Sequence, residues 1–171
     1  MSPNSNLATF TPRVLLAFFE DTGWYKSNYT YAHESSWGYK AGCDFVHKPC
    51  LAQGTKAAPG APTDARHFCN DNNAKGCTAN RLMQGYCNVK ANTAAIPPEF
   101  RYFTDDPNWG GTVSHQDHCP TFTGYSNGDC RDVANAPSGR NYYGEGYGDG
   151  SRCFDSDLNF EVERYSVTSP A

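Results

Sequence analysis

The 171-residue chain carries 14 Lys and Arg against 18 Asp and Glu, which gives a formal net charge of -4 at pH 7. Its basic residues are scattered, so the sequence has no basic patch of the kind that binds nucleic acid or an anionic membrane surface. We therefore expect no nucleic-acid partner. The length is sufficient for one ordinary domain or about one and a half.

Residues 11 to 23 give the clearest helical pattern in the chain. Thr11 is the expected N-cap, Pro12 takes the first helical position, and Gly23 ends the helix. The segment between them, RVLLAFFED, places apolar side chains on every side of a helix. Burial of each larger side chain is worth roughly 1.5–3 kcal/mol, so we expect this helix to be buried all round by neighbouring elements.

Loops and turns dominate the sequence after this helix. Residues 51–62, LAQGTKAAPGAP, have the Gly, Ala and Pro content of a surface loop or insertion. The run YYGEGYGDG at residues 142–150 is interpreted as a mobile surface loop in preference to an aromatic binding loop. Apolar and polar side chains alternate at residues 160–167, which predicts a β-strand near the end of the chain.

The eight cysteines are even in number, irregularly spaced and without a C-x-x-C pair, so disulfides in an oxidising compartment are the default interpretation. They are Cys43, Cys50, Cys69, Cys77, Cys87, Cys119, Cys130 and Cys153. Asn28-Tyr29-Thr30 is an N-glycosylation acceptor, which matters if the chain is secreted.

The two ends do not show the targeting signals that this composition would lead one to expect. The opening MSPNSNLATFTP lacks the basic and apolar regions of a secretory signal, and the tail RYSVTSPA lacks the hydrophobic stretch of a GPI-anchor signal. The longest apolar run, residues 14–19, is too short to span a membrane. A composition typical of secreted proteins without a targeting signal suggests that one or both ends are missing.

Neither metal-binding nor nucleophilic chemistry has a strong signature in the sequence. His115 and His118 next to Cys119 could reach one ion, but the segment is not helical and no second cluster completes the ligand set, so solvated polar residues beside a disulfide are favoured. The acid pairs at 20–21 and 105–106 are interpreted as solvated carboxylates. The sequence contains neither G-x-S-x-G nor H-E-x-x-H.

An ordered series of short motifs resembles the leishmanolysin family of surface metallopeptidases, from the family's Met-turn to about residue 155 of this chain. The motifs are Met1-Ser2-Pro3, LLAFFEDTGWY (15–25), W-G-x-x-A-G-C-x-F-x-x-x-x-C (37–50), FCN (68–70), C-x-x-x-R-L-x-x-G-x-C (77–87), PP and YFTD (97–105), C-P (119–120), Y-S-x-G-x-C (125–130) and R-C (152–153). Their order and cysteine spacing make the resemblance specific.

The resemblance implies an α+β fold in two parts. Residues 1–49 would be a remnant of a metzincin-like catalytic lobe, with the Met-turn, one buried helix and its tail. Residues 50–171 would be a disulfide-rich C-terminal domain of loops and antiparallel strands, truncated at its end. Met1 would be the Met-turn methionine under the zinc, although a start methionine would look identical.

The family's disulfide order implies the pairs Cys50–Cys119, Cys69–Cys87 and Cys77–Cys153. By the same resemblance, Cys43 and Cys130 would pair with cysteines outside this chain and remain unpaired within it.

The resemblance also implies the function of a parent protein. Two histidines of H-E-x-x-H and a third histidine would bind zinc upstream of residue 1, so this chain itself would hold no zinc and be inactive alone. The parent would cleave protein or peptide substrates at the cell surface or outside the cell, with host surface or matrix proteins as candidate partners. The alternative is a non-catalytic, disulfide-rich surface module for binding or adhesion.

Overall fold

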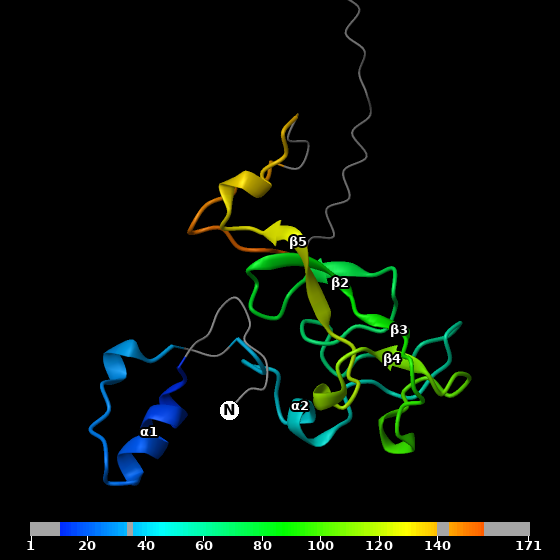
Figure 1. The fold of residues 1–171 in the computed structure, drawn as a ribbon, viewed down its shortest axis with the longest axis horizontal. Coiled ribbons are helices and arrows are strands. Elements are labelled where there is room, and N and C mark those ends of the chain that lie inside the picture. Colours follow the sequence, from blue (N-terminus) through cyan, green and yellow to red (C-terminus); the bar gives the residue numbers. More distant parts are fainter. Residues whose placement is uncertain (1–10, 34–35, 140–143, 156–171) are drawn as a thin grey trace, which may run out of the picture.

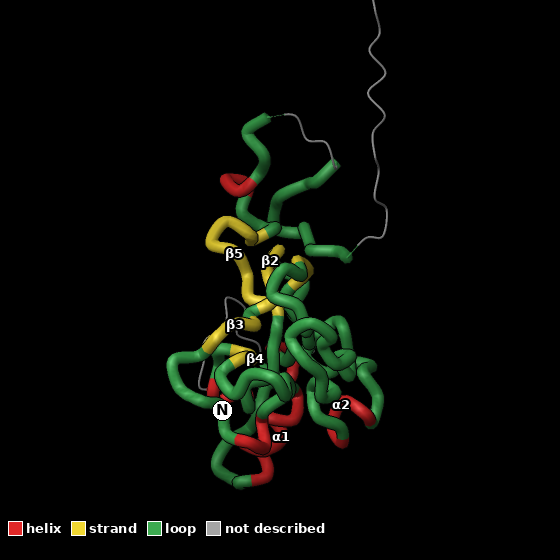
Figure 2. Tube along the Cα trace, turned by 90° about the vertical axis from the view of Figure 1, so that its right-hand side faces the viewer, coloured by secondary structure: helices red, strands yellow, loops and turns green. Residues whose placement is uncertain are grey.

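The computed structural model describes residues 11–33, 36–139 and 144–155. Within these residues the fold is mixed, with few helices, short antiparallel strands and three disulfides, which confirms the predicted disulfide-rich α+β class. Loops make up most of the trace (Figure 2). The elements are α1 (Arg13–Asp21), α2 (Asp44–His47), β1 (Lys75–Cys77), β2 (Met83–Cys87), β3 (Val89–Ala91), β4 (Trp109–Gly111) and β5 (Phe122–Asp129) (Figure 1).

Two small antiparallel sheets form the frame of the described chain. One has the strand order β1-β2-β5, and the other pairs β3 with β4. The pairing of β2 with β5 shifts register between Met83 and Gly85. A Cβ atom at Gly85 would lie 2.3 Å from the carbonyl oxygen of Thr123, so only glycine allows the two strands to approach this closely.

The main hydrophobic core lies around two of the disulfides. Its buried members are Cys50, Leu51, Phe68, Cys69, Cys87, Val89, Tyr102 and Phe103. A second, smaller cluster consists of Cys77, Cys130 and Cys153. Because half-cystines supply so much of the buried surface, covalent links compensate for a small apolar core.

The loop at residues 51–62 is exposed at its tip, as the sequence predicts, but its base belongs to the core. Leu51 is 1% exposed and pairs in a β-bridge with Pro62. Gly54 forms a second bridge with Phe103. The first bridge therefore closes the loop at its base, and the second joins the loop to the core.

The predicted helix at residues 11–23 is confirmed as α1, but its cap and its burial differ from the prediction. The N-cap position is Pro12, not Thr11, and it makes no side-chain capping hydrogen bond because proline has no polar side chain. Gly23 follows the helix with φ 73°, as expected for a C-terminal glycine.

The expectation that the helix is buried all round is wrong for the described chain. None of its residues is buried, and Val14 and Phe18 are 75% and 62% exposed. Figure 1 shows α1 and the loop after it set apart from both sheets. The helix forms from its local pattern, but the described residues provide no second element to cover it.

Several predictions fall partly or wholly outside the described residues. These are the role of Met1, the strand at residues 160–167 and the first part of the YYGEGYGDG run. In the described residues no helix is long and apolar enough to cross a membrane.

Candidate functional site

The histidines near residue 115 do not form a metal site with their neighbours. His118 Nδ1 lies 2.9 Å from the carbonyl oxygen of Gly111, and Cys119 is bonded to Cys50. Among the described residues there is no group of three or more His, Cys, Asp or Glu side chains that could hold a metal ion. The described part of the chain therefore does not fit the ligand requirement of a catalytic zinc, which takes three protein ligands.

The acidic pair at residues 105–106 holds a loop in place. Asp105 accepts a hydrogen bond from the backbone N–H of Lys56 at 3.0 Å, and Asp106 accepts one from Lys56 Nζ at 2.9 Å. The hydrogen bond from Lys56 is the main cause that lowers the pKa of Asp106. Lys56 Nζ also lies 5.3 Å from the ring centroid of Trp109. Both carboxylates thus face one lysine and anchor the 51–62 loop, so they are not arranged as a catalytic pair.

The other acidic pair lies at the end of α1. Glu20 Oε2 accepts a hydrogen bond from the hydroxyl of Tyr29 at 2.8 Å, and this bond raises the pKa of Tyr29. Arg13 lies over the same ring at 5.5 Å from its centroid. These contacts attach the loop after α1 to one side of the helix.

The most highly organised group of side chains is a histidine surrounded by aromatic rings, and we call it the His67 joint. It consists of Trp37, Phe45, Asp64, His67 and Phe68. The His67 ring is 3% exposed, and its centroid lies 5.0 Å from that of Trp37 and 4.9 Å from that of Phe45. Phe45 also stacks on Phe68 at 5.5 Å. The joint therefore packs the segment that contains α2 against the core.

Polar contacts fix the orientation of the ring in the His67 joint. The backbone N–H of Gly38 donates to His67 Nε2 at 2.9 Å, and Nδ1 lies 3.3 Å from Asp64 Oδ1, an ion-pair distance without hydrogen-bond geometry. Arg66 donates to both carboxylate oxygens of Asp64. This guanidinium is the main cause that holds the pKa of Asp64 well below its usual range, and burial opposes it.

A shallow pocket of about 230 Å³ opens beside the joint. It is lined by Ser36, Tyr39, Arg66, His67, Ala79 and Arg81. Its two guanidinium groups are already paired, Arg66 with Asp64 and Arg81 with Asp155. The pocket thus offers neither a carboxylate available as a general base nor an activated nucleophile for hydrolysis.

The structure contains three disulfides, Cys50–Cys119, Cys69–Cys87 and Cys77–Cys153, which are the same pairs as those that the resemblance implies. The two remaining cysteines differ, since Cys43 is exposed and Cys130 is buried.

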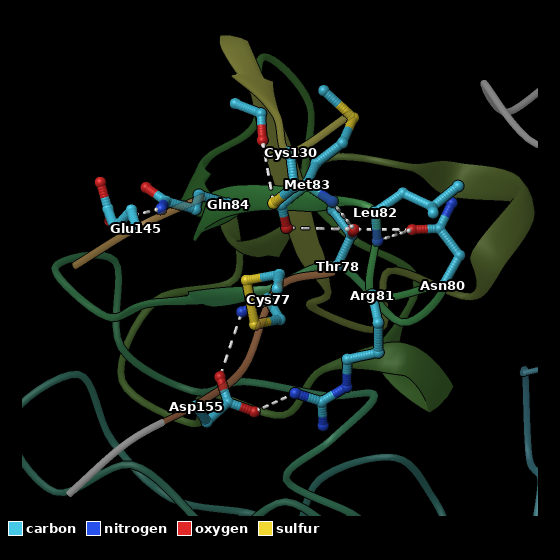
Figure 3. Close-up of a disulfide and its surroundings, with 12 residues drawn as sticks. Cys77, Thr78, Asn80, Arg81, Leu82, Met83, Gln84, Cys130, Glu145 and Asp155 are labelled. Atoms are coloured by element: carbon cyan, nitrogen blue, oxygen red, sulfur yellow. Dashed lines mark hydrogen bonds and ion pairs between the residues drawn. A yellow bond between two sulfur atoms is a disulfide. The ribbon is translucent and has the colours of Figure 1, made fainter. Parts of the chain in front are cut away.

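Cys130 lies near the Cys77–Cys153 bridge (Figure 3). Burial is the main cause that raises the pKa of its thiol, which keeps it protonated and unreactive. On the other side of the bridge, Asp155 accepts from the backbone N–H of Cys77 and pairs with Arg81. Within the described residues Cys130 is therefore a buried cysteine without a disulfide partner.

Sequence reasoning missed the His67 joint. The FCN motif includes Phe68, but nothing in the segment DARHFCN distinguishes a packed histidine from an exposed one. Trp37 and Phe45 precede His67 by 30 and 22 residues in the sequence, so no periodicity in the local sequence indicates their contacts with it.

Comparison with known proteins finds similarity to one family over nearly the whole chain. A family model described as Leishmanolysin matches residues 1–168. Leishmanolysin of Leishmania donovani is 31% identical over 157 residues, which cover 91% of this chain and 25% of the relative. The leishmanolysin-like peptidase of Drosophila pseudoobscura pseudoobscura is 33% identical over 181 residues, covering 89% of this chain and 25% of the relative. The chain thus spans about a quarter of the length of these relatives.

Proposed function

The chain belongs to the leishmanolysin family of peptidases, and on this premise we propose that it forms the C-terminal, disulfide-rich part of a zinc metalloendopeptidase. The zinc ligands and the general base of the proposed enzyme lie upstream of residue 1. The enzyme cleaves protein or peptide substrates at the cell surface or outside the cell. On its own, the 171-residue chain does not hydrolyse peptide bonds.

One observation carries this proposal: a family match over nearly the whole chain is combined with a sequence that has no H-E-x-x-H. In zinc peptidases with that motif, two of its histidines bind the ion and its glutamate activates the attacking water. When bound, zinc would supply the Lewis acid for that water. The described residues do not offer a ligand set for it, so the chemistry is assigned to the preceding part of the protein.

The surface of α1 supports the proposal that another part of the protein covers it. Val14, Leu15, Phe18 and Phe19 form an exposed apolar face, which we call the α1 stripe. Burial of side chains of this size is worth roughly 1.5–3 kcal/mol each, which favours packing of the rest of the catalytic lobe on this face. In this arrangement α1 lies behind the active site, and Met1 is the Met-turn residue.

The disulfides support the location that we propose. Three disulfides within 171 residues are typical of proteins that fold in an oxidising compartment and act outside the cell. Candidate partners of the whole protein are then its peptide substrates and surface or matrix proteins of a host.

An alternative function is a non-catalytic binding or adhesion module. The observation that favours it is the exposed aromatic side chains near α1, with Trp24 85% and Tyr31 71% exposed. Aromatic residues are enriched where proteins bind one another, so the same surface could serve a binding partner instead of a catalytic lobe.

Two experiments separate these functions. The purified 171-residue chain should retain no stoichiometric zinc at neutral pH and should not cleave casein. Chelator-sensitive cleavage by the pure chain would refute the proposal. The genomic DNA upstream of codon 1 provides the second test. An in-frame H-E-x-x-H supports the peptidase, whereas a stop codon or a signal peptide directly upstream supports the binding module.

If the upstream reading frame exists, the longer product completes the test. It should cleave casein in a chelator-sensitive manner, and replacement of the motif glutamate by glutamine is the matched inactive control. Removal of residues 1–171 from that product should reduce secretion or activity, because the catalytic lobe then lacks the α1 stripe as a packing partner. A fully active lobe without these residues would show that they have a separate role.

A further inference from the structure

One motif has no role in the proposed peptidase. Asn28-Tyr29-Thr30 is the only N-x-S/T tripeptide in the 171-residue sequence. It lies in the loop after α1, where Asn28 immediately precedes a short 3-10 turn, Tyr29–Tyr31. Asn28 and Thr30 are both exposed. A modifying enzyme could therefore reach the tripeptide in the folded chain.

The geometry of the tripeptide leaves the amide nitrogen of Asn28 available. Its Oδ1 accepts two hydrogen bonds from Thr30, one from the backbone N–H at 3.1 Å and one from the hydroxyl at 2.7 Å. None of the described residues forms a hydrogen bond with Nδ2 of Asn28. Both donors thus engage the carbonyl oxygen of an exposed residue, and the nitrogen that would form a glycosidic bond is not used in these contacts.

We propose that Asn28 is an N-glycosylation site. In the reaction, Asn28 Nδ2 forms a bond to the anomeric carbon of an oligosaccharide that is carried on a lipid diphosphate. The bond between that carbon and the diphosphate oxygen breaks, the lipid diphosphate leaves, and Nδ2 loses one proton. No oxidation or reduction takes place. The inference rests on the secretory route that is part of the proposed function.

The position of Asn28 is compatible with a covered α1 stripe. Ser27 donates to the carbonyl oxygen of Leu16 at 2.6 Å, and Tyr29 donates to Glu20, so the loop packs on the side of α1 that bears Leu16 and Glu20. At 3.6 residues per turn, Val14 and Phe18 lie on the opposite side of the helix. A glycan at Asn28 therefore leaves the part of the stripe that Val14 and Phe18 form free for a packing partner.

The test uses the full 171-residue chain with a cleavable secretory signal in a eukaryotic host. We expect the secreted chain to migrate more slowly in gel electrophoresis, and peptide N-glycosidase should abolish the shift. Mass spectrometry should then find aspartate in place of Asn28, which is the product that this enzyme leaves. Because the signal is supplied and no peptidase assay is involved, the result does not depend on whether the parent is a peptidase.

Three variants sharpen the test. Asn28→Gln and Thr30→Val should each lose the shift completely, because one removes the nucleophile and the other removes the acceptor hydroxyl. Thr30→Ser is the matched control, since it keeps the hydroxyl and should keep the glycan. A secreted, disulfide-bonded chain whose Asn28 peptide is unmodified would overturn the proposal. A glycosidase-sensitive shift that persists in Asn28→Gln would also overturn it.

Discussion

The α1 region, residues 11–33, and the disulfide core at residues 50–130 differ in how they bury apolar side chains. The core covers Phe103 to 1% exposure, whereas α1 leaves Phe18 62% exposed. Both segments form their local structure, but only the core has partners within the described chain and covalent links between them. The difference shows that α1 lacks covering neighbours among the described residues, whereas the core is held together by its own packing and disulfides.

The largest difference in the free energy of unfolding is expected between two alanine variants, each of which replaces one phenylalanine of one region. Phe103→Ala should lower the free energy of unfolding by about 3–5 kcal/mol, because it opens a cavity in the main core. Phe18→Ala should change it by no more than about 0.5 kcal/mol, since the ring is already in solvent. Denaturant unfolding monitored by circular dichroism measures both. Similar losses in the two variants would show that α1 is packed in solution.

Removal of a core disulfide should have the next largest effect. Replacement of both Cys50 and Cys119 by serine should cost about 2–5 kcal/mol, because the bridge restricts the unfolded chain over a sequence separation of 69. The matched control is Cys43→Ser, which removes an exposed cysteine and should leave unfolding within about 0.5 kcal/mol of the parent chain. If the double variant unfolded at the same denaturant concentration as the parent chain, the bridge would not stabilise the fold.

A smaller effect is expected at the His67 joint, which connects the α2 segment to the core. Arg66 lowers the pKa of Asp64 in the folded chain below the unfolded value of about 3.9. The unfolded state therefore binds more protons in acid, so this contribution is present above the unfolded pKa and is lost as pH falls through the folded pKa. Its size is about 1–2 kcal/mol, reduced by the solvent exposure of Arg66.

Asp64→Asn provides the measurement for the joint. Unfolding between about pH 5 and pH 2, followed by tryptophan fluorescence, should show a smaller loss of stability in the variant than in the parent chain. Asp44→Asn is a suitable control, because Asp44 pairs with Lys48 at an exposed site. If the stability of the parent chain and of Asp64→Asn fell identically with pH, Asp64 would not contribute to the loss of stability in acid.

The sequence predicts α1 well because its signals are local: a proline at the start, an apolar segment and Gly23 at the end. Its exposure could not be predicted, because burial depends on a neighbour and not on the helix itself. The strands β1 and β2 escaped prediction because they are short, contain Gly76 and Gly85, and do not alternate clearly.

The disulfides and the candidate sites likewise include some features that the sequence predicts and others that it does not. Eight cysteines allow on the order of a hundred complete pairings, so spacing alone could not select the three bridges, and the family resemblance was needed. The acceptor tripeptide at Asn28 is visible in the sequence, but its exposure and its hydrogen bonds come from the structure. The His67 joint has no sequence signal, because it is formed by long-range packing.

The smallest effect on stability is expected for the α1 stripe, where the change should appear in binding instead. The 171-residue chain should bind a hydrophobic dye, and the double variant Val14→Ser with Phe18→Ser should lose about half of the dye fluorescence, because it removes the most exposed apolar groups of the helix. Val133→Ser is the control, since Val133 is 69% exposed but lies outside the stripe, and it should keep the signal. Equal losses in both variants would mean that the dye does not report on α1. A parent chain that binds no dye would show that the stripe is covered in solution, and α1 would then resemble the core instead of contrasting with it.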